Sequence, residues 1–280
     1  MKHISCAFLC VHVFGLLFVR MSFKEESKRV NVICIKWGDY YLPEDVNKLF
    51  RAVSRNFENH GVDFYCFTDQ FKGLDPVIKI RDLPQLKGGK FAYPKEAGLC
   101  DDNLGGLAGQ RVVYFDLDSV ICGSLDRLIY FMDTNEPYIT RDYGRDSDEI
   151  GGSNLYSWVV GSLGYIKTHY EMNVETVLAE YGSASQEYLS AQIIKKYEKL
   201  NFYPNEWHVS FKKHCLRKWP VNFFCEAKKP NAEALLVNFH GDPKIHDAVS
   251  GTWSSRVKIP FYKRIYKFTK PTTWVGEHWY

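Results

Sequence analysis

The sequence predicts an α/β protein built on a single doubly wound, mixed sheet, with helices on both faces and an elaborated C-terminal half. Three observations support this fold class. Apolar runs of strand length alternate with segments of helical spacing in the first half of the chain. The second half mixes helices and strands less regularly. A chain of 280 residues with 45% apolar residues can bury the core of one large domain.

The first half of the chain is expected to run strand, helix, strand, strand, helix, strand. Strands are predicted at residues 30–35, 62–67, 77–80 and 111–115, where apolar residues dominate. Pro43 opens a helix whose apolar positions keep helical spacing as far as Phe57, before His60-Gly61 ends it. Pro94 begins the second helix.

The second half is predicted to be mixed. Residues 124–132, 174–181 and 186–200 have the spacing of helices, while 138–140, 157–165, 207–211 and 234–239 look extended. Residues 144–152 are polar and rich in glycine and are expected to form a loop. We therefore place one domain at residues 30–250, between an N-terminal segment at 1–29 and a basic, aromatic tail at 251–280.

Charge and cysteine content limit the partners and the compartment. The formal net charge of +3 is too small to indicate nucleic acid as a general partner. Cys34, Cys66 and Cys122 sit in apolar runs, and no pair of cysteines has Cys-x-x-Cys spacing. Reduced core thiols are therefore expected, which places the protein in the cytoplasm or peripherally on the cytoplasmic face of a membrane.

Residues 4–19 form an apolar run between Lys2 and Arg20. This run is shorter than the roughly 20 residues that a membrane-spanning helix needs. Three interpretations stay open: a cleaved signal peptide, a short membrane anchor, or an upstream extension of a protein that starts at Met21. The absence of a small-x-small cleavage motif between Leu17 and Arg29 disfavours the signal peptide.

The tail combines basic and aromatic residues. The stretch from Arg256 to Lys270 holds six Lys or Arg residues and no acid, interleaved with aromatic and aliphatic side chains. This composition favours peripheral contact with anionic lipid or with an anionic acceptor, with Trp253, Trp274 and Trp279 as candidate anchors. Alternatively, the aromatic side chains pack on the domain and the lysines face water.

The most informative motif is Tyr114-Phe115-Asp116-Leu117-Asp118, where an apolar strand ends in two carboxylates one residue apart. Open α/β sheets bind ligands beyond the carboxyl ends of their strands, so Asp116 and Asp118 are placed to hold a divalent cation beside a phosphate. The alternative is a pair of turn or helix-capping aspartates.

Two other strand ends carry candidate ligand-binding residues. The late strand ends in His240-Gly241-Asp242-Pro243-Lys244, which offers a metal-binding imidazole, a glycine that permits close backbone approach and a diphosphate-binding lysine. The first strand ends in Trp37-Gly38-Asp39-Tyr40-Tyr41, where Gly38 would let a planar ring approach the backbone and Tyr41 could stack on a base. Each motif alone also fits an ordinary turn or a core aromatic.

Together these segments resemble bacterial sugar transferases of the GT-A fold and are similar to the retaining glycosyltransferases of family 8. The resemblance spans most of residues 30–247. Its matching pieces are Lys36-Trp37-Gly38-x-x-Tyr41, Tyr114-Phe115-Asp116-Leu117-Asp118, Gln186-Glu187-Tyr188-Leu189, Ser210-Phe211-Lys212-Lys213-His214-Cys215 and Phe239-His240-Gly241-Asp242-Pro243-Lys244. It implies that Asp116, Asp118 and His240 hold Mn²⁺ or Mg²⁺ on a nucleoside diphosphate sugar.

The resemblance implies further roles. Trp37, Gly38, Tyr41 and Gly241 would bind the nucleotide sugar, with Lys244 on the diphosphate and Lys95 facing the donor. The spacing from His240 to Lys244 is shorter than is usual in the family. Gln186 would lie under the reacting face of the sugar, although Ser185 replaces the expected Asp. Asp142 would bind sugar hydroxyls.

The expected activity is metal-dependent transfer of a hexosyl-type sugar to an acceptor hydroxyl on a glycan, lipopolysaccharide or another glycoconjugate. The main alternative is a haloacid dehalogenase-type phosphatase, because Asp116-Leu117-Asp118-Ser119-Val120 also fits a loop in which Asp116 is the nucleophile. Such a loop usually lies near the N-terminus, whereas several elements precede it here. A nonenzymatic sugar-binding protein is the other alternative.

Overall fold

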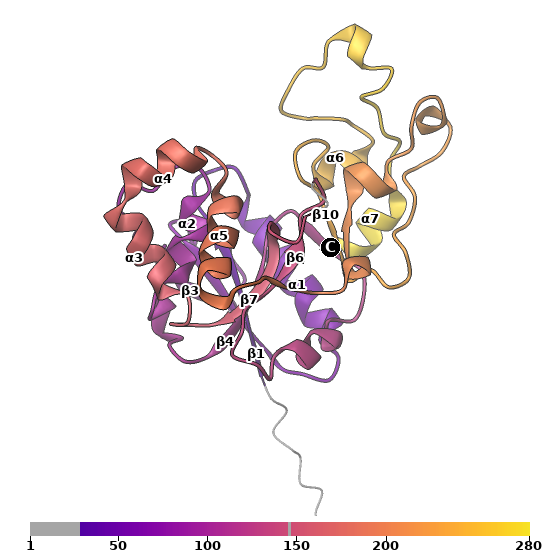
Figure 1. Cartoon of the computed structure of the whole chain (residues 1–280). Coiled ribbons are helices and arrows are strands. Elements are labelled where there is room, and N and C mark those ends of the chain that lie inside the picture. Colours follow the sequence, from indigo (N-terminus) through magenta and orange to yellow (C-terminus); the bar gives the residue numbers. More distant parts are fainter. Residues whose placement is uncertain (1–28, 145–146) are drawn as a thin grey trace, which may run out of the picture.

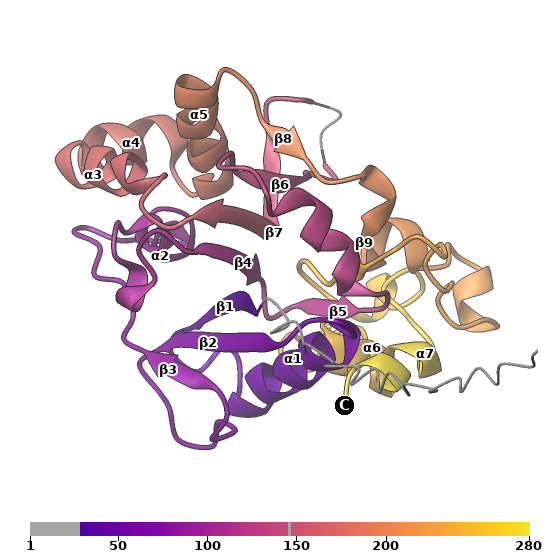
Figure 2. The same ribbon diagram turned by 90° about the horizontal axis from the view of Figure 1, so that it is seen from below.

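The computed structural model describes residues 29–144 and 147–280. Its centre is a seven-stranded sheet in the order β3-β2-β1-β4-β7-β6-β8, which can be followed in Figure 2. The strands are β1 (Val30–Lys36), β2 (Val62–Thr68), β3 (Lys79–Arg81), β4 (Arg111–Phe115), β6 (Tyr138–Arg141), β7 (Gly151–Val159) and β8 (Asn201–Phe202). Strands β1 to β4 are parallel, while β7 runs antiparallel to both β4 and β6. The predicted mixed α/β fold is confirmed.

A smaller sheet lies beside the carboxyl end of β4. It has three strands in the order β5 (Ser119–Ile121), β10 (Leu236–Asn238) and β9 (His208–Ser210). Strand β10 is antiparallel to β5 and parallel to β9. Because β5 follows β4 after only three residues, the small sheet brings the late strand β10 next to the two aspartates.

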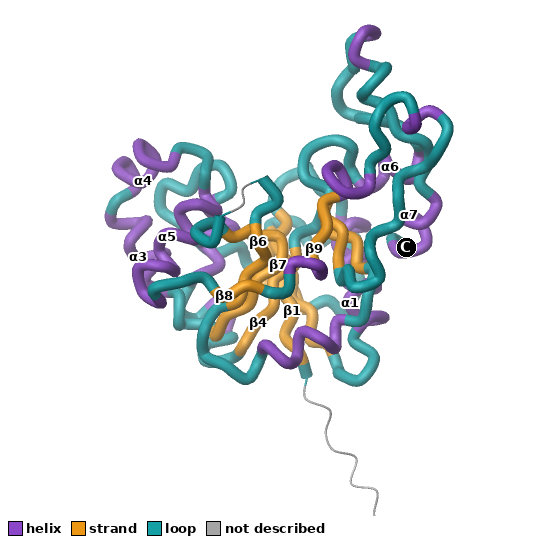
Figure 3. The backbone as a smooth tube through the Cα atoms, turned by 45° about the vertical axis from the view of Figure 1, so that its right-hand side comes forward, coloured by secondary structure: helices purple, strands orange, loops and turns teal. Residues whose placement is uncertain are grey.

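Helices cover both faces of the large sheet (Figures 1 and 3). One face packs against α1 (Pro43–Asn56), α6 (Ile245–Ser250) and α7 (Thr273–His278), and the other against α2 (Tyr93–Glu96), α3 (Gly164–Met172), α4 (Val174–Tyr181) and α5 (Ser185–Tyr197). Strand alternation in β1 sorts the side chains between the two cores. Val32 and Cys34 join the core of α1, while Ile33 and Ile35 join the core of α5.

The switch point of the sheet lies between β1 and β4. The chain leaves β1 through α1 towards β2 and β3, and later returns to the other side of β1 as β4. Ligands of open α/β sheets bind outside the carboxyl ends of the strands at such a point. Both the turn after Lys36 and the aspartates after Phe115 therefore lie at the expected position.

Most elements occur where the sequence predicts them, but the region after β6 differs. The predicted loop at 144–152 is wrong at its end, because β7 begins at Gly151. The predicted extended segment 157–165 ends early, since helix α3 begins at Gly164. Residues 125–131 form a 3₁₀ helix, close to the predicted helix. The predicted N-terminal segment lies outside the described residues, apart from Arg29.

The described part of the chain contains no helix that is both long and apolar enough to span a bilayer. Its cysteines are free thiols: Cys34, Cys66, Cys100, Cys122, Cys215 and Cys225. Cys225 is exposed, while the others are buried or half-buried. The expectation of unpaired thiols is thus confirmed for these residues.

Candidate functional site

Asp116 follows β4 directly and is paired with a lysine of helix α2. Its Oδ2 lies 2.9 Å from Lys95 Nζ, and its Oδ1 accepts a hydrogen bond from the Leu117 amide. Lys95 Nζ is also 3.2 Å from Glu96 Oε1. Burial disfavours the Lys95 ammonium, but the charges of Asp116 and Glu96 outweigh it and raise the pKa of Lys95. A fixed positive charge therefore stands beside Asp116.

Asp118 has different neighbours, because the strand ends at Phe115 and a turn separates the two acids. Its Oδ1 accepts a hydrogen bond from Asn238 Nδ2 at 2.7 Å, and its Oδ2 lies 3.8 Å from Lys244 Nζ. Burial, together with the charge of Asp116, raises the pKa of Asp118 to about 6. The two carboxylates thus repel each other, and a cation bound by both would relieve this repulsion.

His240 follows β10 and points its Nε2 to Ser210 Oγ, at 2.7 Å. Burial and the nearby Lys212 and Lys213 lower its pKa, which favours the neutral ring that a metal needs. Among residues 29–144 and 147–280, no group of three or more His, Cys, Asp or Glu side chains is arranged to hold a metal ion. The two carboxylates fit an oxygen-preferring divalent cation, whereas His240 Nε2 is occupied by the Ser210 hydroxyl.

The first cavity, which we call the aromatic cavity, lies outside β1. It has a volume of about 390 Å³ and is lined by Tyr40, Tyr41, Asp118, Lys244 and Arg256, among others. Lys244 Nζ lies 5.3 Å from the Tyr40 ring centroid, and the Arg256 guanidinium lies 3.8 Å from the same centroid. A planar group and an anion can therefore bind in one place.

The second cavity, which we call the central cavity, has a volume of about 620 Å³. It collects several predicted residues from distant parts of the chain: Lys95, Asp142, Gln186 and His240. Gln186 comes from the first turn of α5, and Asp142 follows β6. Asp142 Oδ1 accepts a hydrogen bond from the Gly144 amide.

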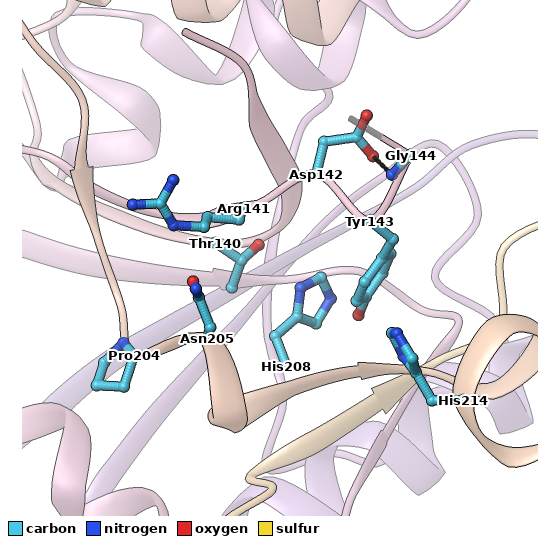
Figure 4. A pocket seen from close by; sticks show the side chains of 9 residues that line it. All are labelled: Thr140, Arg141, Asp142, Tyr143, Gly144, Pro204, Asn205, His208 and His214. Carbon is cyan, nitrogen blue, oxygen red and sulfur yellow. Dashed lines mark hydrogen bonds between the residues drawn. The ribbon is translucent and has the colours of Figure 1, made fainter. Parts of the chain in front are cut away.

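A third cavity, which we call the histidine cavity, shares residues 142–144 with the central cavity and is drawn in Figure 4. Its volume is about 470 Å³, and Tyr143, His208 and His214 line it. The ring centroids of Tyr143 and His208 are 4.1 Å apart. Within the described part of the chain, neither nitrogen of His208 nor the Tyr143 hydroxyl has a hydrogen-bond partner. Buried polar atoms of this kind normally bind something.

The two histidines that line the histidine cavity are held in their neutral form. Burial lowers the pKa of His208 to about 3, and it outweighs the Arg141 backbone, which favours the charged ring. Burial also lowers the pKa of His214. The Arg141 guanidinium pairs with Asp148 and lies over the Phe202 ring. The sequence gives no local signal for this cavity, because only long-range packing brings His208 and Tyr143 together.

Four predicted residues lie outside the linings of these cavities: Asp116, whose contacts are given above, and Trp37, Gly38 and Gly241. Trp37 is exposed, and Gly38 has a φ of +56°, a conformation that favours glycine, with open space at the position of a Cβ. The positive φ explains why a glycine occupies this position in the turn after β1. Gly241 likewise has a φ of +72°, in the turn that leads from His240 to Lys244.

No protein-family model matches this chain, and no curated protein matches it in sequence. Solved structures match it in fold. The bifunctional glycosyltransferase WbbM, in its apo form, matches with a TM-score of 0.52 and 15% identity, over 79% of this chain and 47% of its own. The apo form of the glycosyltransferase GlyE of Streptococcus pneumoniae TIGR4 matches with a TM-score of 0.52 and 9% identity, over 89% of this chain and 63% of its own.

The galactosyltransferase LgtC, solved in complex with donor and acceptor sugar analogues, also matches this chain in fold. It matches with a TM-score of 0.50 and 11% identity, over 84% of this chain and 99% of its own. This chain spans about half the length of WbbM. At these identities, the likeness shows that the chain has the GT-A type of fold.

Proposed function

We propose that this protein transfers a sugar from a nucleoside diphosphate sugar to an acceptor hydroxyl on a glycan, lipopolysaccharide or another glycoconjugate. The observation that carries the proposal is the pairing of Asp116 with Lys95 and of Asp118 with Lys244 at the switch point of the sheet. Two acids and two ammonium groups at this edge suit a diphosphate and its cation. The fold, which WbbM, GlyE and LgtC share, supports the same class of activity.

The cavities suggest how the donor would lie. The base and ribose would occupy the aromatic cavity against Tyr40 and Tyr41, and the diphosphate would reach Lys244 past the turn at Gly241. Trp37 and Gly38 would contribute by holding the turn that presents Tyr41. The sugar would then enter the central cavity, where Lys95, Asp142 and Gln186 lie.

We propose that Asp116 and Asp118 hold Mn²⁺ or Mg²⁺, with His240 as third ligand once its Nε2 leaves the Ser210 hydroxyl. Such an ion, when bound, supplies positive charge opposite the departing diphosphate. Lys244 adds a fixed positive charge at the same place. Asp142 would accept hydrogen bonds from the sugar, and Gln186 would position its reacting face. A retaining outcome is proposed on this arrangement.

The acceptor would bind in the histidine cavity. Asp142, Tyr143 and Gly144 line both this cavity and the central cavity, so an acceptor there would lie next to the sugar. The unpaired atoms of His208 and Tyr143 suit hydroxyl groups. Because the lining histidines are neutral, an uncharged, hydroxyl-rich ligand fits better than an anion.

Donor hydrolysis tests the proposed function. The purified protein, with Mn²⁺ and a panel of nucleotide sugars, should slowly release nucleoside diphosphate. Asp118→Asn should abolish this release and weaken metal-dependent nucleotide binding, whereas Asp82→Asn, at an exposed site, should leave both near the wild-type level. Release of inorganic phosphate from small phosphoesters, without nucleotide release, would instead indicate a phosphatase.

A further inference from the structure

Two segments near the C-terminus, residues 217–229 and 256–270, lie side by side. Asn222 Nδ2 donates hydrogen bonds to the carbonyl oxygens of Ile265 and Phe268, at 3.5 and 3.3 Å. The rings of Phe223 and Phe268 stack with centroids 4.7 Å apart. Residues 256–270 form the yellow arm that projects away from the large sheet in Figure 1. We call the surface formed by these two segments the C-terminal face.

The C-terminal face exposes large apolar side chains from both segments. Phe261 is 82% exposed and Phe224 75% exposed. The other exposed apolar side chains are Trp219, Val221, Phe223, Val257, Tyr262, Ile265 and Tyr266. Apolar side chains gathered on one surface are typical of a surface that contacts a partner or a membrane.

The charges of the C-terminal face are almost all positive. Its exposed basic residues are Lys218, Lys228, Lys229, Arg256, Lys258 and Arg264. Glu226 is the one acid in the two segments, and its carboxylate accepts hydrogen bonds from the amide and hydroxyl of Thr273. A hollow of about 350 Å³ in the arm is lined by Lys258, Arg264 and Lys267 beside apolar walls.

We propose that the C-terminal face binds the surface of an anionic lipid bilayer. Phe224, Phe261 and Ile265 would enter the boundary between headgroups and acyl chains, while basic residues such as Lys258 and Arg264 would contact lipid phosphates. This interaction goes beyond the transferase reaction and does not depend on it.

A bilayer explains the aliphatic side chains better than nucleic acid or a polysaccharide does. Val221, Val257 and Ile265 cannot stack on bases or sugar rings, but they lose contact with water when they enter lipid. The anchors differ from those that the sequence predicts. Trp274 and Trp279 are buried in the core, so their predicted role as anchors is wrong, and Trp219 is the exposed tryptophan of this surface.

Vesicle sedimentation of the full chain tests the proposal. Binding should be tighter to phosphatidylcholine vesicles that contain phosphatidylglycerol than to phosphatidylcholine alone, and the difference should shrink as salt increases. Phe261→Ser with Ile265→Ser should weaken binding at least tenfold, because the loss of even one buried apolar side chain would produce a change of about that size. Lys258→Ala with Arg264→Ala should remove most of the preference for anionic lipid.

The matched control is Phe71→Ser with Lys72→Ala, an exposed aromatic–basic pair far from this face in the sequence. It should bind vesicles like the wild type. Circular dichroism should show that all variants are folded. Equal vesicle binding by the wild type and both C-terminal variants, or an equal loss in the control, would overturn the proposal.

A local probe separates the C-terminal face from the apolar run at residues 4–19, which also could bind lipid. Cys225 is the exposed cysteine of the described residues and lies within the face. In the full chain with Cys6→Ser and Cys10→Ser, a nitrobenzoxadiazole label on Cys225 should shift its emission to the blue on phosphatidylglycerol vesicles. Vesicle binding without this shift would place the contact elsewhere and overturn the proposal.

Discussion

Lys95 Nζ lies 2.9 Å from Asp116 Oδ2 and 3.2 Å from Glu96 Oε1, and the Lys95 and Glu96 side chains are only 12% and 2% exposed. The ammonium therefore compensates two acids in a place that water hardly reaches. Glu96 Oε1 also accepts a hydrogen bond from Ser153, which fixes this cluster to β7. A buried charge of this kind is costly when its partner is lost.

Lys95→Met should destabilise the protein. It removes the positive charge and leaves Asp116 and Glu96 without their buried partner, which should cost about 3 kcal/mol of the free energy of unfolding. Urea denaturation at pH 7 measures this change. Lys90→Met changes the same residue type at an exposed position nearby and should cost much less. An equal loss in the two variants would contradict a structural role for the Lys95 cluster.

The free energy of unfolding of the metal-free protein should depend on pH through the titration of Asp118. Its pKa is about 6 in the folded protein against an ordinary value of 3.8, so the folded state binds more protons in this window. The Asp118 contribution to stability is therefore greatest below about pH 4 and falls as the pH rises towards about 6. Asp118→Asn keeps an oxygen for Asn238 and removes the charge.

Relative to the wild type with a chelator, Asp118→Asn should gain about 2 to 3 kcal/mol of stability between pH 4 and pH 7. Denaturation curves at several pH values measure the difference. Asp82→Asn, at an exposed position, should show no such pH-dependent gain. A constant difference between Asp118→Asn and the wild type across this range would show that Asp118 titrates normally.

Nucleotide binding should depend on Tyr40. One face of this ring contacts the Arg256 guanidinium, and Lys244 lies 5.3 Å from the ring centroid. Tyr40→Leu should raise the Kd of the preferred nucleoside diphosphate about tenfold, because the aromatic contact is lost. Isothermal titration calorimetry measures this Kd. Tyr130→Leu, at an 86% exposed ring, is the control and should bind like the wild type.

His208 and His214 should behave differently when each is replaced by Phe. Neither nitrogen of His208 has a partner within the described residues, so His208→Phe should leave stability nearly unchanged or slightly increased. His214 Nδ1 accepts a hydrogen bond from the Ser210 amide at 3.0 Å. His214→Phe should therefore cost about 1 to 2 kcal/mol.

The same His208→Phe variant tests the acceptor side of the proposed function. The KM for the acceptor should rise, and the ratio of transfer to donor hydrolysis should fall about fivefold or more, in line with one lost hydrogen bond. Steady-state kinetics with and without acceptor provide both values. An unchanged acceptor KM would remove the histidine cavity from the acceptor site.

The parts of the fold that could be predicted from sequence carry local signals. β1, α1, β2 and β4 follow from apolar runs, helical spacing and a proline at the start of the helix. The start of β7 has no such signal, since Gly151 and Gly152 favour strands poorly. These residues are extended because they pair with Arg141 and Thr140 of β6. A Cβ at Gly151 would lie 2.6 Å from Ile139, so packing against β6 requires glycine.

In the site, too, some residues have a local sequence signal and others are brought together only by long-range packing. Asp116, Asp118 and Lys244 could be predicted because each follows a strand, and strand ends meet at one edge of a sheet. The resemblance implies only that Lys95 faces the donor. Its partnership with Asp116 could not be predicted, because the short helix α2 has no sequence signal that aims it at β4. The burial of His208 could not be predicted from the sequence, because it follows from the packing of three distant segments.

Arg256 belongs both to the aromatic cavity and to the base of the arm. Its guanidinium donates to the Tyr40 carbonyl oxygen and stacks on the Tyr40 ring. A lipid surface that shifts the arm would thereby act as an effector of nucleotide affinity. Thermodynamic reciprocity then requires the nucleotide to change the affinity for lipid by the same factor. Arg256 would thus couple binding to the membrane with binding of the donor nucleotide.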